Sequence, residues 1–231
     1  EGSIIVRSAG EVVETLPLEV MLADAYLPDE NHSNVWMFTS GVDDYFPGLT
    51  EGQVDRMIKY TAHRHRIDAV GGFEPHGSAF DSTMMQDYLP YLTGEAFTAA
   101  EGYHGPGQGE GENLFPIGMY GSDVLGETRE SVQRESDKWV RWFDAHAPDV
   151  QYFRYLIDEP GEVQYPFIRK RAGWIHDNPG PGSRLPVFTT REYTPEIDES
   201  IDVWAGGQTI PLDELPKVRE QGDDHMFYNG F

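Results

Sequence analysis

The chain of 231 residues contains no cysteine, so disulfides, thiolate metal sites and a cysteine nucleophile are all excluded. Lysine is scarce as well: four of the 17 basic residues are lysines, at positions 59, 138, 170 and 217, and the rest are arginines. No apolar run approaches the ~18 residues that a membrane-spanning helix needs, and no charged-then-apolar signal segment is present. The first residue is Glu1 rather than Met. We therefore expect that an upstream segment has been removed and that the protein is extracellular or periplasmic.

Basic residues are far fewer than acidic ones. Asp and Glu number 40 against 17 Lys and Arg, which gives a formal net charge of −23. Such a field repels polyanions, so a nucleic-acid partner is not expected. An acidic, lysine-poor surface suits high salt, which screens self-repulsion, and a saline habitat is a hypothesis that follows. The hydrophobic fraction of 39% and the aromatic fraction of 13% predict a folded domain with a substantial core.

Strand-like and helical patterns alternate along most of the chain. Residues 50–53 have capping-box spacing, and apolar residues at helical spacing follow them. The same kind of spacing predicts helices at 81–92, 123–146, 165–175 and 212–220. Seven strands are predicted from residue 34 onward, and an eighth near 17–23 either joins them or ends a preceding domain. The seven are 34–39, 68–73, 114–120, 150–157, 185–189, 201–204 and 226–228.

Alternating strands and helices predict parallel strands with helical crossovers. An open doubly wound sheet usually carries a glycine-rich phosphate turn after its first strand, and none follows Thr39. The pattern therefore favours an α/β fold of the (β/α)8 TIM-like barrel class. Its closing strand and helix are expected to be missing at the C-terminal end. Residues 1–30 are interpreted as a lead-in strand and linker, and 31–231 as the barrel.

The strongest candidate for chemistry is the acidic pair Asp158 and Glu159. It follows a predicted strand, and in a parallel barrel the active site lies at the carboxyl ends of the strands. Adjacent strand residues point to opposite faces, so both acids reach one cleft only if the strand ends and twists there. Pro160 favours this, because proline donates no ladder hydrogen bond and holds Glu159 extended. The alternative is an acidic pair that only stabilises the start of the next helix.

A resemblance adds to this interpretation. The run YLIDEP at 155–160 is followed by WIH at 174–176, VFTT at 187–190, IDVW at 201–204 and FYN at 227–229. This order resembles glycoside hydrolase family 123, which is linked to the domain of unknown function 4091. The similarity is best over 150–231. The glycine-rich loop at 101–111 does not match characterised members, and the β-sandwich that precedes their barrel is absent from this sequence.

The resemblance implies a β-N-acetylgalactosaminidase that works by substrate-assisted retention on a carbohydrate substrate, without metal or cofactor. Asp158 would then orient the 2-acetamido group of the substrate, and Glu159 would protonate the leaving oxygen. A general acid needs a raised pKa, which a neighbouring carboxylate and a partly apolar pocket provide. Two alternatives stay open: a two-carboxylate glycosidase that pairs Glu159 with Glu74, and a carbohydrate-binding or surface barrel without activity.

Further candidates for substrate binding lie at predicted strand ends. Trp204, Tyr228 and Tyr120 could stack on a sugar ring, and Asn229 could bind a hydroxyl, although each would also serve as ordinary packing. Glu74 and His76 follow the strand that ends at 73, on the expected rim of the site.

Three other features are weaker. His63 and His65 are two apart on a predicted helix and do not share a face, so they do not indicate a metal site. Arg191 could contact an anionic sugar substituent or form a salt bridge. The loop at 105–111 has spaced glycines but carries glutamates and no lysine, which argues against phosphate binding and favours a flexible rim or lid.

Overall fold

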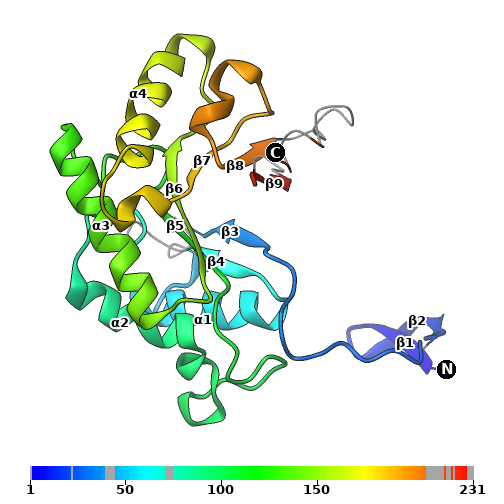
Figure 1. Ribbon diagram of the computed structural model, residues 1–231. Helices are drawn as coiled ribbons and strands as arrows, with labels where there is room; N and C mark the ends of the chain where they lie inside the picture. Colours follow the sequence, from blue (N-terminus) through cyan, green and yellow to red (C-terminus); the bar gives the residue numbers. More distant parts are fainter. Residues whose placement is uncertain are drawn as a thin grey trace.

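The computed structural model describes residues 2–21, 23–39, 45–70, 75–206, 216, 220 and 222–227. At its centre is a five-stranded parallel sheet in the order β5-β6-β7-β8-β9 (Figure 1). These strands are β5 (Leu114–Ile117), β6 (Gln151–Ile157), β7 (Val187–Thr189), β8 (Val203–Gly206) and β9 (Asp224–Phe227). A separate parallel pair is formed by β3 (Trp36–Phe38) and β4 (Asp68–Val70).

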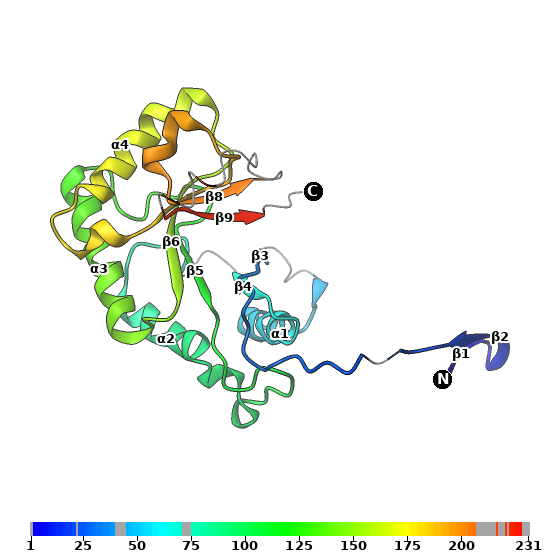
Figure 2. The same ribbon diagram turned by 45° about the vertical axis from the view of Figure 1, so that its right-hand side comes forward.

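Four α-helices connect the parallel strands, and they lie on the outer side of the curved sheet (Figures 1 and 2). They are α1 (Glu51–Arg64), α2 (Ser82–Thr93), α3 (Arg129–His146) and α4 (Tyr165–His176). Short 3-10 helices complete the connections: η2 (Glu95–Phe97), η3 (Ala99–Glu101), η4 (Glu162–Gln164), η5 (Pro181–Arg184) and η6 (Pro195–Ser200).

The predicted (β/α)8 barrel is wrong. The described residues form a five-stranded parallel half-barrel sheet with small additional sheets and four α-helices, not a closed ring of eight strands and eight helices. The predicted strand at 17–23 does not join the parallel strands either. Its first residues belong to β2 (Glu11–Leu18), which pairs antiparallel with β1 (Gly2–Ser8). Most of the predicted helix at 212–220 lies outside the described residues.

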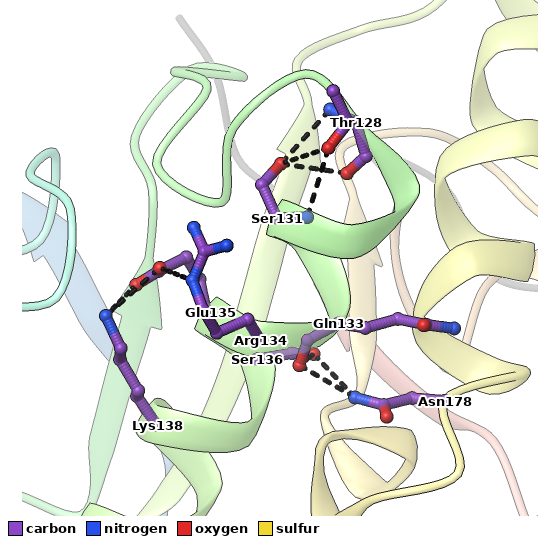
Figure 3. Close-up of polar contacts among 8 residues, drawn as sticks. All are labelled: Thr128, Ser131, Gln133, Arg134, Glu135, Ser136, Lys138 and Asn178. Atoms are coloured by element: carbon purple, nitrogen blue, oxygen red, sulfur yellow. Dashed lines mark hydrogen bonds and ion pairs between the residues drawn. The ribbon is translucent and has the colours of Figure 1, made fainter.

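Helix ends follow the side chains that cap them. Thr50 caps α1 and exchanges hydrogen bonds with Gln53 in a capping box, and the Asp81 carboxylate accepts from two backbone N–H groups at the start of α2. Thr128 and Ser131 form the same reciprocal cap on α3 (Figure 3). Such caps satisfy N–H groups that have no partner inside the helix, each typically worth ~1 kcal/mol.

Figure 3 also shows how α3 is joined to the segment that follows α4. The Asn178 side-chain amide donates to the Gln133 carbonyl at 2.9 Å and to the Ser136 hydroxyl at 3.2 Å. Glu135 binds Arg134 and Lys138 on the exposed side of the same helix. The Asn178 bonds fix the packing of two helices on the outer face of the sheet, whereas exposed ion pairs contribute little.

The strands bury both faces. Side chains such as Phe115, Ile117 and Val187 face the helices and join Trp139 and Phe143 in the larger core. The inner, concave face carries a second cluster, Leu114, Phe153, Tyr155, Phe188, Val203 and Ala205. Trp36 from β3 packs on this inner cluster, with ring centroids 5.9 Å from both Phe153 and Phe188. The two-sided burial is typical of parallel sheets.

The N-terminal hairpin of β1 and β2 stands away from the rest of the molecule on an extended linker (Figures 1 and 2). All of its residues are exposed, including Ile4, Ile5, Val13 and Leu16. A two-stranded hairpin is marginally stable by itself in water. It therefore contributes nothing to the core that carries the parallel strands.

Candidate functional site

Asp158 lies directly after β6, at the edge where the parallel strands end. Its Oδ1 accepts a hydrogen bond from the Tyr155 hydroxyl at 2.5 Å and one from the Thr190 hydroxyl at 2.6 Å. Tyr155 is buried in the inner cluster, and the Asp158 side chain is partly exposed. Both of these donors are neutral hydroxyls that bond to the same oxygen, so they hold the carboxylate in one orientation.

Glu159 makes the chain turn. Its φ of +40° lies in the left-handed region, which few non-glycine residues adopt. Its backbone N–H donates to the Thr190 hydroxyl at 2.7 Å, and the following Pro160 carbonyl accepts from Arg191 Nη1 at 2.6 Å. A strained backbone of this kind costs of order 1–3 kcal/mol and persists only where the surroundings impose it. Here the residues after β7 impose it.

Thr190 connects the two acids, and sequence reasoning missed it as a site residue. The hydroxyl of this buried side chain donates to the Asp158 carboxylate and accepts from the Glu159 backbone N–H. A hydroxyl has one donor and two acceptor positions, so both bonds are compatible. The only signal in the sequence is a threonine at the end of the neighbouring strand, which is common in strands for other reasons.

Glu159 lines an open cleft of about 430 Å³. Its other walls come from the segments that follow β7 and from the end of β8: Thr190, Arg191, Glu192, Tyr193, Thr194, Ala205 and Gly206. Asp158 is not among these lining residues. Thr190, which does line the cleft, donates to the Asp158 carboxylate at 2.6 Å, so Asp158 lies one hydrogen bond away from it.

The surroundings of Asp158 are aromatic. Tyr120 follows β5, is 53% exposed and stacks on Phe38 at a centroid distance of 4.7 Å. Burial of its hydroxyl raises the pKa of Tyr120, and the negative charge of Asp158 raises it further. The Tyr155 ring lies 6.1 Å from that of Tyr120. An exposed tyrosine face thus lies close to a fixed carboxylate.

A buried arginine holds the turn that carries Tyr120. Arg154 is 1% exposed, and its Nη1 donates to the Ile117 carbonyl at 3.0 Å and to the Tyr155 carbonyl at 2.8 Å. Its Nη2 donates to the Ser122 carbonyl at 2.5 Å. Desolvation lowers the pKa of Arg154 to about 9. Backbone carbonyl oxygens accept from both terminal nitrogens of this guanidinium, and these bonds link the ends of β5 and β6, whereas its buried Nε has no hydrogen-bond partner among the described residues.

His76 does not lie on the rim where the sequence placed it. It is 1% exposed; its Nδ1 is 3.0 Å from the Pro116 carbonyl, and its Nε2 is 3.2 Å from the Tyr88 hydroxyl. We assign the ring proton to Nδ1, because a carbonyl can only accept. Desolvation, and next the Lys59 charge, lower the pKa of His76 to about 3. A neutral, enclosed imidazole of this kind is not positioned to touch a sugar.

His76 borders a buried ionic network. Lys59 Nζ donates to Glu112 Oε1 at 3.0 Å and to the Tyr88 hydroxyl at 2.8 Å, and Tyr88 donates to Glu112 Oε2 at 2.7 Å. The nearby Asp68 is also buried; desolvation and the Glu112 charge raise its pKa to about 8. These groups join α1 and α2 to β4 and β5, so their role is structural.

The remaining predicted site residues divide in two. Trp204 is fully buried on the helix side of β8, with Tyr193 packed 5.2 Å away, so its ring is not available for stacking on a sugar. Glu74, Tyr228 and Asn229 lie outside the described residues. Asp158, Glu159 and Tyr120 are the predicted residues that the structure brings together.

The glycine-rich loop is not a lid over this site. It precedes β5, at the opposite edge of the sheet from Asp158, and it packs on α1 and the end of α2. His63 stacks on Phe97 at 3.7 Å and contacts the Gly107 carbonyl at 2.9 Å. A Cβ on Gly94 would lie 2.0 Å from the Gly109 carbonyl oxygen. Within the loop, a Cβ on Gly111 would lie 2.0 Å from the Leu92 carbonyl oxygen, whereas Gly102 and Gly109 have no atom that close, so only some of the glycines are needed for close packing.

Within the described part of the chain, no three histidine, aspartate or glutamate side chains gather in a way that could hold a metal ion. The same residues include no helix both long and apolar enough to cross a membrane. No protein-family model matches the chain, and no curated protein matches it either.

Proposed function

We propose that this protein is a glycoside hydrolase that cleaves β-linked N-acetylhexosaminides with help from the substrate's own acetamido group. One observation supports the proposal above the others: Thr190 bonds to both Asp158 and Glu159 at the end of β6, beside an open cleft that Glu159 and Thr190 line. Exposed aromatic faces suit the apolar face of a sugar ring. Acids at this edge of parallel strands are placed for catalysis.

In the proposed reaction, the 2-acetamido oxygen attacks the anomeric carbon while the bond to the leaving oxygen breaks. Glu159 gives its proton to that oxygen. Asp158 accepts a hydrogen bond from the acetamido N–H and stabilises the positive charge that develops there. A water molecule then attacks the anomeric carbon while the bond between that carbon and the acetamido oxygen breaks. Glu159 takes the proton of the water, so the acid and the acetamido group are both restored and the configuration is retained.

The fixed orientation of Asp158 suits this role. Its Oδ1 already accepts from Tyr155 and Thr190, so the carboxylate does not rotate freely when substrate binds. Catalytic groups that are oriented before binding cost less reorganisation during reaction.

The experiment is hydrolysis of a chromogenic N-acetyl-β-galactosaminide by the wild-type chain and by Glu159→Gln, Asp158→Asn and Glu162→Gln. We expect the first two variants to lose activity by about 10²-fold or more, because each removes a group that acts in the transition state. Glu162 is exposed three residues further on and serves as the matched control, with unchanged activity. Full activity in Glu159→Gln rules out Glu159 as the acid.

One observation favours a second candidate, a two-carboxylate glycosidase. Glu192 lines the same cleft as Glu159, with its Cγ 3.0 Å from the position of a Cβ built on Gly206. Glu192 would then act as the base or nucleophile. Replacing the acetamido group of the substrate by a hydroxyl abolishes turnover under the first proposal and spares it under the second. Glu192→Gln has the reverse pattern: it inactivates only the two-carboxylate enzyme.

A further inference from the structure

We infer that two copies of this chain associate through the outer side of α4, with the two helices antiparallel across a two-fold axis. The contact surface consists of four residues, which we call the α4 stripe: Val163, Phe167, Lys170 and Trp174. Because α4 lies on the outer side of the curved sheet, the side of the helix that faces away from the sheet is open to a second molecule (Figures 1 and 2).

The α4 stripe has helical spacing and is exposed to solvent. Its residues are four, three and four positions apart, so their side chains follow one another along one side of the helix. The opposite side carries Ile168, Ala172 and Ile175, which are buried in the larger core. Val163, on the 3-10 turn directly before α4, is 90% exposed, and Phe167 is 47% exposed. Neighbouring apolar side chains left in water, unlike single ones, indicate a partner.

The aromatic rings of the stripe are held in place before any partner binds. The Arg171 guanidinium carbon lies 5.8 Å from the centre of the Phe167 ring and 5.4 Å from that of the Trp174 ring. Arg171 is itself fixed by an ion pair with Asp123 at 2.5 Å. On the exposed side, Lys170 Nζ lies 4.8 Å from the Trp174 ring. Side chains that are already ordered lose little conformational entropy on binding.

The spacing of the stripe matches a second copy of itself. Intervals of four, three and four are the same in both directions, so an antiparallel copy meets the stripe in register. Phe167 then lies opposite the partner's Lys170, and Val163 lies opposite the partner's Trp174. Such a contact is self-complementary, as a two-fold interface requires. Each pairing occurs twice, and each Lys170 gains a second aromatic ring.

A glycine beside the stripe is not required by the single chain. Gly173 lies inside α4, where glycine costs up to about 1 kcal/mol relative to alanine. A Cβ built on it meets no described atom within 4 Å, and its φ lies outside the left-handed region. Gly173 is three residues after Lys170, on the neighbouring turn. Without a side chain at this position, the backbone of a second helix can approach closely.

The local charge permits two acidic chains to meet at α4. The net charge of −23 makes two copies repel one another from most directions. Residues 162–177 differ, because they contain three cations, at 169–171, and two carboxylates, at 162 and 177. Salt screens the remaining long-range repulsion. Association should therefore strengthen as the salt concentration rises, which is the opposite of the behaviour of an interface held by ion pairs.

The test is the oligomeric state of the chain, measured by sedimentation velocity from about 10 µM to about 1 mM protein at low and high salt. We expect a reversible dimer whose fraction rises with salt. Phe167→Ser and Val163→Ser should each raise the dimer dissociation constant at least about ten-fold, because each removes two apolar contacts per dimer. Leu49→Ser is the matched control, since Leu49 is 45% exposed and lies outside α4. It should leave the constant unchanged.

Two charge variants test the register of the helices. Phe167→Lys brings like charges together at both central contacts, and Lys170→Glu places a carboxylate against each Phe167 ring, so each variant alone should be monomeric. An equimolar mixture of the two should form a heterodimer. In the mixture one central contact becomes an ion pair, and the other keeps its original cation and ring.

Gly173→Ala separates association from folding. Alanine should raise the melting temperature of the dilute monomer, because it favours the helix, and should weaken the dimer. A lower melting temperature would mean that the single chain needs this glycine, and would remove it as evidence for a partner helix.

Three results overturn the proposed dimer: a wild-type chain that stays monomeric at the highest concentration and salt, a dimer that salt dissociates, or equal dissociation constants for the stripe variants and Leu49→Ser. A mixture of the charge variants that stays monomeric overturns the antiparallel register. Thermal unfolding shows whether each variant is folded. Val163→Ser keeps the test decisive if Phe167→Ser folds poorly, because Val163 has almost no contacts to lose in the single chain.

Discussion

Replacing Gly118 by alanine tests whether the buried Arg154 guanidinium fixes the turn that carries Tyr120. Gly118 has a φ of +82°, and a Cβ there would lie 1.7 Å from Arg154 Nη1. The guanidinium would have to move away from the carbonyls of Ile117 and Tyr155, to which that nitrogen donates. Hydrogen bonds to charged groups contribute about 1.5–3 kcal/mol each. Losing both would cost roughly 3–6 kcal/mol.

A second glycine separates this cost from backbone strain. Gly102 has a φ of +83°, but no atom lies within 4 Å of a Cβ built there. Gly102→Ala therefore incurs only the penalty of a left-handed alanine, about 1–2 kcal/mol. Both variants share that penalty, so the difference between their free energies of unfolding measures the cost of displacing Arg154.

The assay is thermal and urea unfolding of the two variants beside wild-type protein. One kcal/mol corresponds to roughly 2–4 °C in a chain of this size, so we expect Gly118→Ala to melt at least about 6 °C below Gly102→Ala. Tyr120 fluorescence cannot be isolated among 12 tyrosines, so unfolding is the better measure. Equal melting temperatures would show that the arginine does not hold this turn, and the account of Tyr120 would have to change.

Three further predictions concern stability. The pKa of His76 is lower in the folded state than in the unfolded state, so its contribution to stability is lost as pH falls from about 6.5 toward 3. The pKa of Asp68 is higher in the folded state, so its contribution to stability is lost as pH rises from about 4 through 8. Between about pH 4 and 6.5 these two residues change the free energy of unfolding in opposite directions. Urea unfolding should show the stability of the wild-type protein falling from pH 6.5 to 8 at up to about 1.4 kcal/mol per pH unit, and Asp68→Asn should remove that fall. A decline that persists in Asp68→Asn contradicts the buried-acid assignment. Lys59→Met should destabilise the folded protein by about 3–5 kcal/mol, because it leaves Glu112 buried without its cation. Adding Glu112→Leu should restore much of that loss. If the double variant shows no recovery, the buried ion pair is not the cause of the loss. Deleting residues 2–18 should shift the melting temperature of the remainder by less than about 2 °C, as expected for an exposed hairpin, and a larger drop would reveal contacts with the body.

Local structure could largely be predicted from the sequence because its causes are local. The caps at Thr50 and Asp81 lie next to the helices that they begin. The pattern of apolar residues likewise predicted the strands that begin near 114 and 150. Closure of the sheet depends instead on contacts between residues far apart in the sequence. Alternating strands and helices require parallel neighbours, but they do not determine how far the sheet curves or how many strands take part, which is why the barrel prediction failed. The strand predicted near 17–23 overlaps only the end of β2, whose partner is the antiparallel β1 and not one of the parallel strands.

The candidate site shows the same division. A strand followed by two acids and a proline located Asp158 and Glu159 at the edge of the sheet. Position along a strand does not determine which face a side chain takes, however, so Trp204 was expected in the site and lies in the core. His76 was misplaced for a related reason, because its ring is buried beside Tyr88 of α2, with Nε2 3.2 Å from the Tyr88 hydroxyl. Thr190 was missed because its bonds to the acids connect residues 31 and 32 positions apart.

Thr190 also explains how two acids that are neighbours in sequence suit the two different tasks of the proposed reaction. A regular strand would send one side chain inward and the other outward to the helices. Here the strand stops, Glu159 adopts a left-handed φ, and one hydroxyl holds both the Asp158 carboxylate and the Glu159 N–H. The backbone strain is stabilised by a bond to the residue that follows the next strand, so the backbone position of Glu159 is set by the sheet and not by a flexible loop. That rigidity is what a reaction requires when one acid must meet the 2-substituent and the other the leaving oxygen.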